Sequence, residues 1–170
     1  RLPTENEWYK AAYYKRGGIN AGYWNYATQS DTVPGNVIGG AANQANYALG
    51  GVLFAVPQSA SFAQDQNLLS DVGAFSASSS AYGTFDQTGN VFEWNDLDGT
   101  ASLTRGLRGG NWASGENTIA AIARGALDPL QPVAGFRLAA PVPEPSTYAL
   151  ALAGLACGAW QTRRRLTKAA

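Results

Sequence analysis

Gly83-Thr-Phe-Asp-Gln-Thr-Gly-Asn-Val-Phe-Glu-Trp94 is the stretch that decides the fold, because it joins a tight turn to a strand. Gly89-Asn90 is a turn signal, and residues 91–94 are rich in side chains that favour strands. A turn running into a strand can aim carboxylates and backbone carbonyls at one point, as a hard cation requires. Asp86 and Glu93 are therefore candidate metal ligands, and a hydrated turn with two solvated acids is the alternative.

The composition of the chain excludes several classes of chemistry. The 170 residues are enough for one domain with a sizeable core. They include no His, which removes the usual general base and any imidazole metal site. The single Cys157 lies in an apolar tail, so the body has no thiol for catalysis or disulfide formation. Because the chain has no Met, we expect the natural N-terminus, with any signal peptide, to lie upstream of Arg1.

The formal net charge of zero hides a split between the body and the tail. Residues 1–140 carry eight Lys and Arg against eleven Asp and Glu, a net charge of −3. The remaining residues carry four basic side chains against Glu144, a net charge of +3. Phosphate binding requires a basic face, so the weakly acidic body is not expected to bind nucleic acid.

The body begins with a predicted helix and continues through loops. Over residues 1–16, Thr4 and Glu7 form a capping box and an apolar stripe follows at helical spacing. Residues 17–80 show little periodicity, so we expect long loops and short strands. A body rich in loops that lacks disulfides needs another means of fixing them, such as a bound cation. Asn46 and Asp71 could supply oxygen ligands there, and turn residues are the alternative for both.

Regular structure is predicted to return between Leu103 and Ala139. Residues 106–112 are typical of a strand entering a glycine turn, and residues 135–139 of a final strand. Three arginines lie in apolar surroundings in this part of the chain and should need carboxylate partners: Arg108, Arg124 and Arg137. Structural ion pairs are predicted for them, rather than an anion site.

The tail has the pattern of a membrane anchor. Residues 141–145 form a Pro-rich, extended linker. Residues 146–162 are largely apolar and would span about 25 Å as a helix, slightly less than the hydrocarbon core of a bilayer. The basic cluster of Arg163, Arg164 and Arg165 should remain cytoplasmic, which places residues 1–140 on the far side of the membrane. The sequence therefore predicts a transmembrane helix within a 146–170 tail.

Four blocks of the body, in order, resemble the signature blocks of the sulfatase-modifying-factor family, which includes the formylglycine-generating enzymes. They are Arg1-Leu-Pro-Thr-Glu-Asn-Glu-Trp8, Gly89-Asn-Val-Phe-Glu-Trp94, Arg108-Gly-Gly-Asn-Trp112 and Gly135-Phe-Arg-Leu138. The resemblance implies a loop-rich α+β fold with little regular secondary structure, related to C-type lectins. It also implies that residues 1–140 are the C-terminal portion of such a domain, with its N-terminal portion missing.

The resemblance implies an oxidase chemistry that this chain lacks the residues to perform. The family's enzymes convert a substrate cysteine to formylglycine and hold copper(I) on two cysteines in the stretch after the Arg-Gly-Gly-Ser-Trp block. The corresponding residues 113–124 contain no Cys, and copper(I) prefers thiolates. A related iron-dependent branch uses histidines, which this chain also lacks. Copper and the oxidase reaction are therefore not expected, and no catalytic residue is assigned.

A calcium site carries over from the family more directly. By position, the resemblance implies calcium ligands at the side chains of Asp86 and Glu93 and the carbonyls of Gly89 and Val91. It also implies a second site with the Asn46 side chain and the Tyr47 carbonyl, completed by either Asp65 or Asp71. Phe92 stands where the family usually has Trp, a residue of the wall rather than a ligand, so the change leaves the implied cation site intact.

The tail resembles a PEP-CTERM sorting signal in its Pro143-Glu144-Pro145 motif, apolar segment and Arg cluster. The resemblance implies recognition by an exosortase and transient residence in the inner membrane. The mature protein would then reside on the cell surface or in the extracellular matrix of a Gram-negative bacterium. We predict an exported, non-catalytic domain that calcium stabilises and that binds an exopolysaccharide or peptide. The alternatives are a formylglycine-generating oxidase acting on sulfatase cysteines and a structural protein of the biofilm matrix.

Overall fold

The computed structural model describes residues 1–61, 63, 65–97, 103–131, 134–140, 155 and 157. The chain forms two compact units, residues 1–139 and 140–170, and the first holds every element considered below. In order, these are α1 (Glu5–Tyr13), β1 (Tyr14–Lys15), the 3-10 helix η1 (Gly18–Asn20), β2 (Gly22–Tyr23), β3 (Ala48–Leu49), β4 (Leu53–Phe54), β5 (Phe92–Asn95), β6 (Arg105–Arg108), β7 (Gly125–Leu127) and β8 (Ala134–Phe136).

The helix α1 begins at the predicted capping box and is shorter than residues 1–16. The Thr4 hydroxyl accepts a hydrogen bond from the Glu7 backbone N–H, and the Glu7 carboxylate accepts one from the Thr4 backbone N–H. The helix ends at Tyr13 because Tyr14 turns to extended backbone and pairs with Tyr23 of β2. Tyr13 is therefore the last residue of the helix, and Tyr14 and Lys15 form a short strand instead of a further helical turn.

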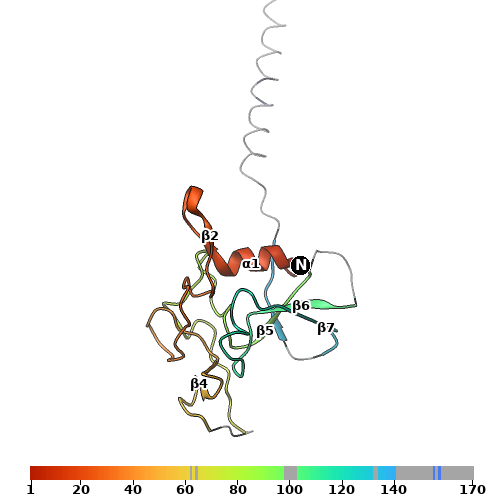
Figure 1. Ribbon diagram of the computed structural model, residues 1–170. Helices are drawn as coiled ribbons and strands as arrows, with labels where there is room; N and C mark the ends of the chain where they lie inside the picture. Colours follow the sequence, from red (N-terminus) through yellow and green to blue (C-terminus); the bar gives the residue numbers. More distant parts are fainter. Residues whose placement is uncertain are drawn as a thin grey trace, which may run out of the picture. The chain divides into compact units, whose positions relative to one another are not determined.

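A four-stranded sheet in the order β7-β6-β5-β8 holds the second half of the body together. The pairs β5–β6 and β6–β7 are antiparallel, and β5–β8 is parallel, with Glu93 opposite Gly135. Figure 1 shows α1 lying beside this sheet, with β4 at the opposite end of the fold. The strands predicted after the Gly89-Asn90 turn, at residues 106–112 and at residues 135–139 are confirmed. The first is shifted by one residue, and the other two are shorter than their patterns.

Two small clusters of buried side chains lie in the described part of the body, and one segment contributes to both. Trp8, Ala12 and Tyr13 of α1 pack with Ala27 and Ala121. Tyr26, Ala45, Tyr47 and Ile119 form the second cluster. Residues 119–121 contribute to both, so the segment after the glycine turn supports α1 on one side and the loops on the other. Burial rather than regular structure holds the loops in place.

The predicted fold class is confirmed in its coarse features. One α-helix, small sheets and long loops make up the described part of the body. The relation to C-type lectins stays a prediction. Among the described residues no helix is long and apolar enough to cross a bilayer. The predicted transmembrane helix over residues 146–162 lies outside that part of the chain, except for Leu155 and Cys157.

Candidate functional site

The turn that precedes β5 has a backbone that only certain residues tolerate. Asp86, Gly89 and Asn90 all have positive φ, at 59°, 79° and 63°. A Cβ on Gly89 would lie 2.1 Å from the carbonyl oxygen of Asn46, so this position requires glycine for space as well as for backbone conformation. Asn46 and Gly89 form a parallel bridge, and the Asn90 N–H donates to the Asn46 carbonyl at 2.7 Å. The two stretches predicted to hold separate calcium ions are therefore neighbours.

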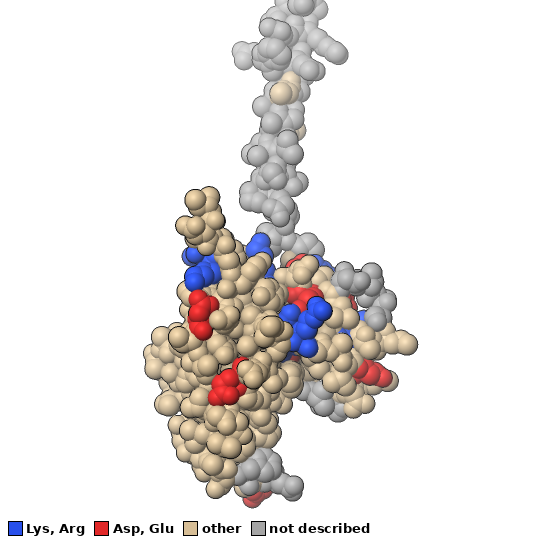
Figure 2. Space-filling model, viewed as in Figure 1, with Lys and Arg blue, Asp and Glu red and all other residues tan. Residues whose placement is uncertain are grey.

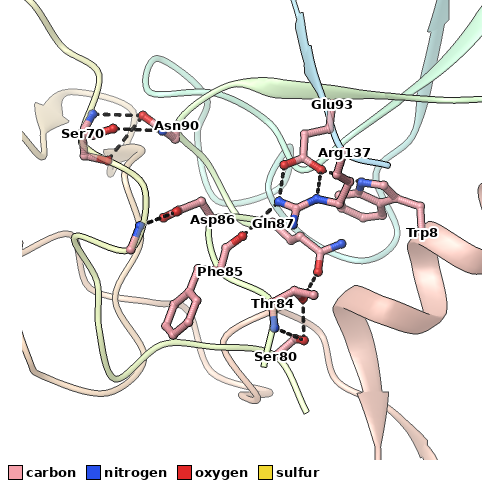
Figure 3. Close-up of polar contacts among 11 residues, drawn as sticks. Trp8, Ser70, Ser80, Thr84, Phe85, Asp86, Gln87, Asn90, Glu93 and Arg137 are labelled. Atoms are coloured by element: carbon pink, nitrogen blue, oxygen red, sulfur yellow. Dashed lines mark hydrogen bonds and ion pairs between the residues drawn. The ribbon is translucent and has the colours of Figure 1, made fainter. Parts of the chain in front are cut away.

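Glu93, on β5, is engaged in a buried ion pair. Its two carboxylate oxygens accept hydrogen bonds from Nε and Nη2 of Arg137, and Oε2 also accepts from Nε1 of Trp8 at 2.7 Å (Figure 3). The Glu93 side chain is 7% exposed and the Arg137 side chain 27%. Nη2 of Arg137 further donates to the Phe85 carbonyl at 2.9 Å. The Glu93 charge is thus neutralised by protein groups, and a cation there would have to displace Arg137.

Asp86, the other predicted acidic ligand, has a different partner. Its Oδ2 accepts a hydrogen bond from the Gly73 N–H at 2.8 Å, and its carboxylate points away from Glu93 in Figure 3. The structure therefore does not bring these two carboxylates to one point. No group of three or more acidic, His or Cys side chains forms a metal-binding cluster within the described residues.

Asn46 lies in a buried amide network that includes one unsatisfied atom. Its Nδ2 donates to the Leu68 carbonyl at 2.9 Å and to Oδ1 of Asn90 at 3.0 Å. The same Asn90 oxygen accepts from the Ser70 N–H at 3.0 Å. The Oδ1 atom of Asn46 accepts no hydrogen bond from the protein, and the residue is only 1% exposed. A buried acceptor without a donor suits a water or a cation.

The remaining residues of the second predicted site differ in how they relate to this network. The Tyr47 carbonyl accepts from Asn36 Nδ2 at 3.4 Å, and the Tyr47 hydroxyl donates to the Pro34 carbonyl. Burial raises the pKa of the Tyr47 hydroxyl, so that group stays neutral. Asp71 follows Ser70 directly, whereas Asp65 does not adjoin a residue that bonds to Asn46 or Asn90. Both aspartates are exposed, and Asp71 is the better placed of the two.

Ser114, in the segment after the Arg108–Trp112 block, is held by the neighbouring Asn111. The Ser114 hydroxyl donates to Oδ1 of Asn111 at 2.9 Å and accepts from the Asn111 N–H at 3.0 Å. Neither partner can take a proton from the hydroxyl, so Ser114 lacks the base that nucleophilic catalysis requires. Ile119 is fully buried in the second core cluster. These contacts close the glycine turn and give the segment a structural role.

Two of the three arginines predicted to be paired have carboxylate partners. Arg108 donates to Glu5 through Nε at 2.7 Å and through Nη2, and its Nη1 donates to the carbonyls of Ala121 and Ala123. Arg137 pairs with Glu93. The prediction is wrong for Arg124, which is exposed and makes no hydrogen bond or ion pair in the described part of the chain.

Arg124 lines a cleft of about 370 Å³, which no sequence pattern predicted. The cleft lies along β6 and β7, and its walls are mainly apolar; they include Phe92, Leu107, Ala123, Ala126 and Leu127, with Asn111 and Thr118 adding polar groups. This volume falls in the range of small-molecule sites. The only signal in the sequence was an arginine within an apolar run, which equally fits a buried ion pair.

Comparison with known proteins yields two matches, one for each part of the chain. The model of the sulfatase-modifying factor enzyme 1-like domain matches residues 1–142. The model of the PEP-CTERM protein-sorting motif matches residues 141–165. No curated protein matches the chain.

Proposed function

Because the chain belongs to the family of sulfatase-modifying factor enzyme 1-like domains, we propose that it is a non-catalytic, exported binding domain of that family. Its sorting motif implies export through a membrane-anchored precursor in a Gram-negative bacterium, with exosortase as the partner that recognises it. The mature domain then resides on the cell surface or in the extracellular matrix, where it binds a glycan or peptide.

The observation that carries the non-catalytic assignment is the chemistry of residues 113–124. The resemblance places the family's cysteine pair in this stretch, and here it contains no Cys. Ser114 is held by Asn111, and Ile119 is buried in the core. A hydroxyl is a poor ligand for copper(I), and no nearby base activates it. The residues present do not fit the family's copper centre.

The apolar cleft along β6 and β7 supports a binding role. Part of its lining, including Phe92, Leu107 and Leu127, lies on β5, β6 and β7, which favours a preformed site over one that forms with its ligand. Arg108, which also lines the cleft, is fixed by Glu5 and two carbonyls. The cleft therefore offers a ligand fixed walls at little cost in ordering.

Calcium is proposed as a stabilising ion rather than as a catalytic one. The buried Oδ1 of Asn46, which lacks a protein donor, supports a cation at the site of Asn46 and the Tyr47 carbonyl. Asp71, which follows Ser70 in the chain, is proposed as its carboxylate ligand. The site with Asp86, Glu93 and the carbonyls of Gly89 and Val91 fits less well, because Arg137 already neutralises Glu93. The ion would tie the loop of residues 68–71 to the Gly89 turn.

The decisive test of function measures catalysis and binding on the same full-chain preparation. We expect no conversion of cysteine to formylglycine in a sulfatase-motif peptide when copper is supplied, as read by mass spectrometry. A glycan array and a peptide library screened with the same preparation should show saturable binding. Substituting Leu127→Asp in the cleft should weaken that binding, whereas Val72→Asp, at an 88% exposed position outside the cleft, should not. Turnover of the peptide would overturn the non-catalytic assignment.

Export is tested separately through the sorting motif. Deleting residues 141–165 should leave the protein unsorted. The substitution Glu144→Ala, which keeps the apolar segment, should also reduce sorting. Fractionation of cells with and without exosortase provides the readout. Equal surface retention of the full chain and the deletion would overturn the proposed route.

A further inference from the structure

We infer that the cleft along β6 and β7 takes an apolar group that carries a carboxylate, with Arg124 as the residue that binds the carboxylate. This inference rests on the proposed binding function and names the ligand class of that same site. Its basis is the combination of an apolar cavity with the one arginine at its edge that has no acceptor among the described residues.

Arg124 differs from the other arginines of the described part of the body. Each of the others has a protein acceptor: Arg1 pairs with Glu7, Arg16 donates to the Ala81 carbonyl, Arg105 pairs with Asp96, Arg108 with Glu5 and Arg137 with Glu93. Arg124 has none among the described residues and remains exposed. Its five N–H donors are free for a ligand.

The domain surface shown in Figure 2 carries few charges, so a charge without a partner is a useful indication of a ligand site. On the face shown in Figure 2, charged side chains of the described residues are few and lie scattered among uncharged ones. A planar guanidinium matches the two oxygens of a carboxylate in a bidentate geometry. Arg124 therefore favours an anion with this shape over a neutral ligand.

The walls of the cleft specify the rest of the ligand. Five apolar side chains border it, namely Phe92, Leu107, Ala123, Ala126 and Leu127, and the Asn111 amide and Thr118 hydroxyl lie among them. A sugar has hydroxyl groups on most of its carbons, and most of these would lose water without gaining a partner here. A hydrocarbon or aromatic body of about the size of one amino-acid side chain loses no such bonds and gains from burial.

The electrostatics decide on which side of Arg124 the carboxylate lies. Arg124, Gly125 and Ala126 also border a second hollow, of about 400 Å³, together with Glu5 and Leu97. Glu5 carries a negative charge that would repel an anion from that hollow, even though Arg108 offsets part of it. The carboxylate is accordingly placed on the cleft side, next to the apolar walls.

The test is a titration of the full chain with small probes, read by calorimetry and by chemical-shift changes. N-acetylphenylalanine should bind about tenfold more tightly than its amide, since one charge-assisted contact is lost in the amide. N-acetylglycine, which keeps the carboxylate and lacks the apolar body, should also bind more weakly than N-acetylphenylalanine. Phenylpropionate and the peptide Gly-Gly-Phe distinguish a free acid from a peptide C-terminus as the source of the carboxylate.

The matched variants separate charge from packing. Arg124→Gln should remove the preference for the acid over the amide. Leu127→Ala should weaken the binding of both compounds while keeping that preference. Lys10→Gln removes a positive charge from an exposed position outside the cleft, and it should change neither the affinity for the two compounds nor the preference for the acid. Equal binding of acid and amide, or an unchanged preference in Arg124→Gln, would overturn the inference and leave the binding function standing. Binding of glycans alone, without any probe, would also overturn it, whereas turnover of a sulfatase-motif peptide would overturn the proposed function itself.

Discussion

The carboxylate of Glu93 in β5 receives two hydrogen bonds from the guanidinium of Arg137, the residue that follows β8. The pair joins two strands that lie parallel and side by side. Removing one member leaves the other charged and partly buried, so Glu93→Gln should lower the free energy of unfolding by about 3 kcal/mol. Chemical denaturation measures this change.

The exposed pair of Arg1 and Glu7 is the control, since Glu7→Gln should cost under about 1 kcal/mol. The double variant with Arg137→Met should recover part of the loss from Glu93→Gln, because no unpaired charge then remains. A cost for Glu93→Gln no larger than that for Glu7→Gln would contradict the assigned role of the buried pair.

The turn at Gly89 makes a second prediction about stability. Gly89→Ala would force a Cβ to within 2.1 Å of the Asn46 carbonyl oxygen at a φ of 79°. It should destabilise the domain by about 3 kcal/mol or more, because backbone on both sides must move. Gly115→Ala is the matched control, with nothing within 4 Å of the new Cβ, and should change the free energy of unfolding by less than about 0.5 kcal/mol. Thermal melts of the two variants compare them directly.

Calcium should raise the melting temperature of the domain and a chelator should lower it. A site filled at a hundredfold excess over its dissociation constant adds about 2.7 kcal/mol to the free energy of unfolding. The calcium-dependent shift, rather than the absolute melting temperature, should be lost in Asn46→Ala and retained in Glu93→Gln, because Glu93 is already paired. Loss of the shift in Glu93→Gln alone would assign the ion to the Asp86–Glu93 site, and no shift in the parent protein would exclude both.

The start of α1 should contribute a stability that depends on pH. The hydrogen bond from Arg1, followed by that from the Thr4 backbone, lowers the pKa of the Glu7 carboxyl from 4.5 to about 2. A depressed pKa in the folded state stabilises the fold above the unfolded pKa, and this contribution is lost as the pH falls from about 4.5 towards 2. The difference in stability between the parent and Glu7→Gln should shrink over this window, as measured by denaturant titration. A constant difference would contradict the assignment.

Several predictions from local sequence are confirmed by the structure. The Thr4–Glu7 capping box depends on residues three apart, and the glycine turn before β5 depends on backbone conformation. The need of Arg108 and Arg137 for carboxylate partners followed from their apolar surroundings, and both have them. Their partners, Glu5 and Glu93, were not predictable, because pairs 103 and 44 residues apart form only when separate segments meet.

The cleft and its unpaired arginine could not be predicted from sequence patterns. Arg124 lies in the same kind of apolar run as Arg108, so composition and spacing cannot distinguish them. The difference lies in which carboxylates the folded chain brings within reach. Likewise, spacing predicted that the carboxylates of Asp86 and Glu93 would aim at one point. In the structure Asp86 has a positive φ, and its carboxylate accepts a hydrogen bond from Gly73 instead.

The sequence by itself determined the family of the body, the sorting motif of the tail and the absence of thiol and imidazole groups from residues 1–140, because each of these is a matter of residue identity and order. The folded structure decides which of the described charges form ion pairs and that Arg124 is left without one. Ion pairing depends on distance and burial, and both are set by strand order: β8 beside β5 brings Arg137 to Glu93, whereas β7 at the sheet edge leaves Arg124 beside an apolar cleft.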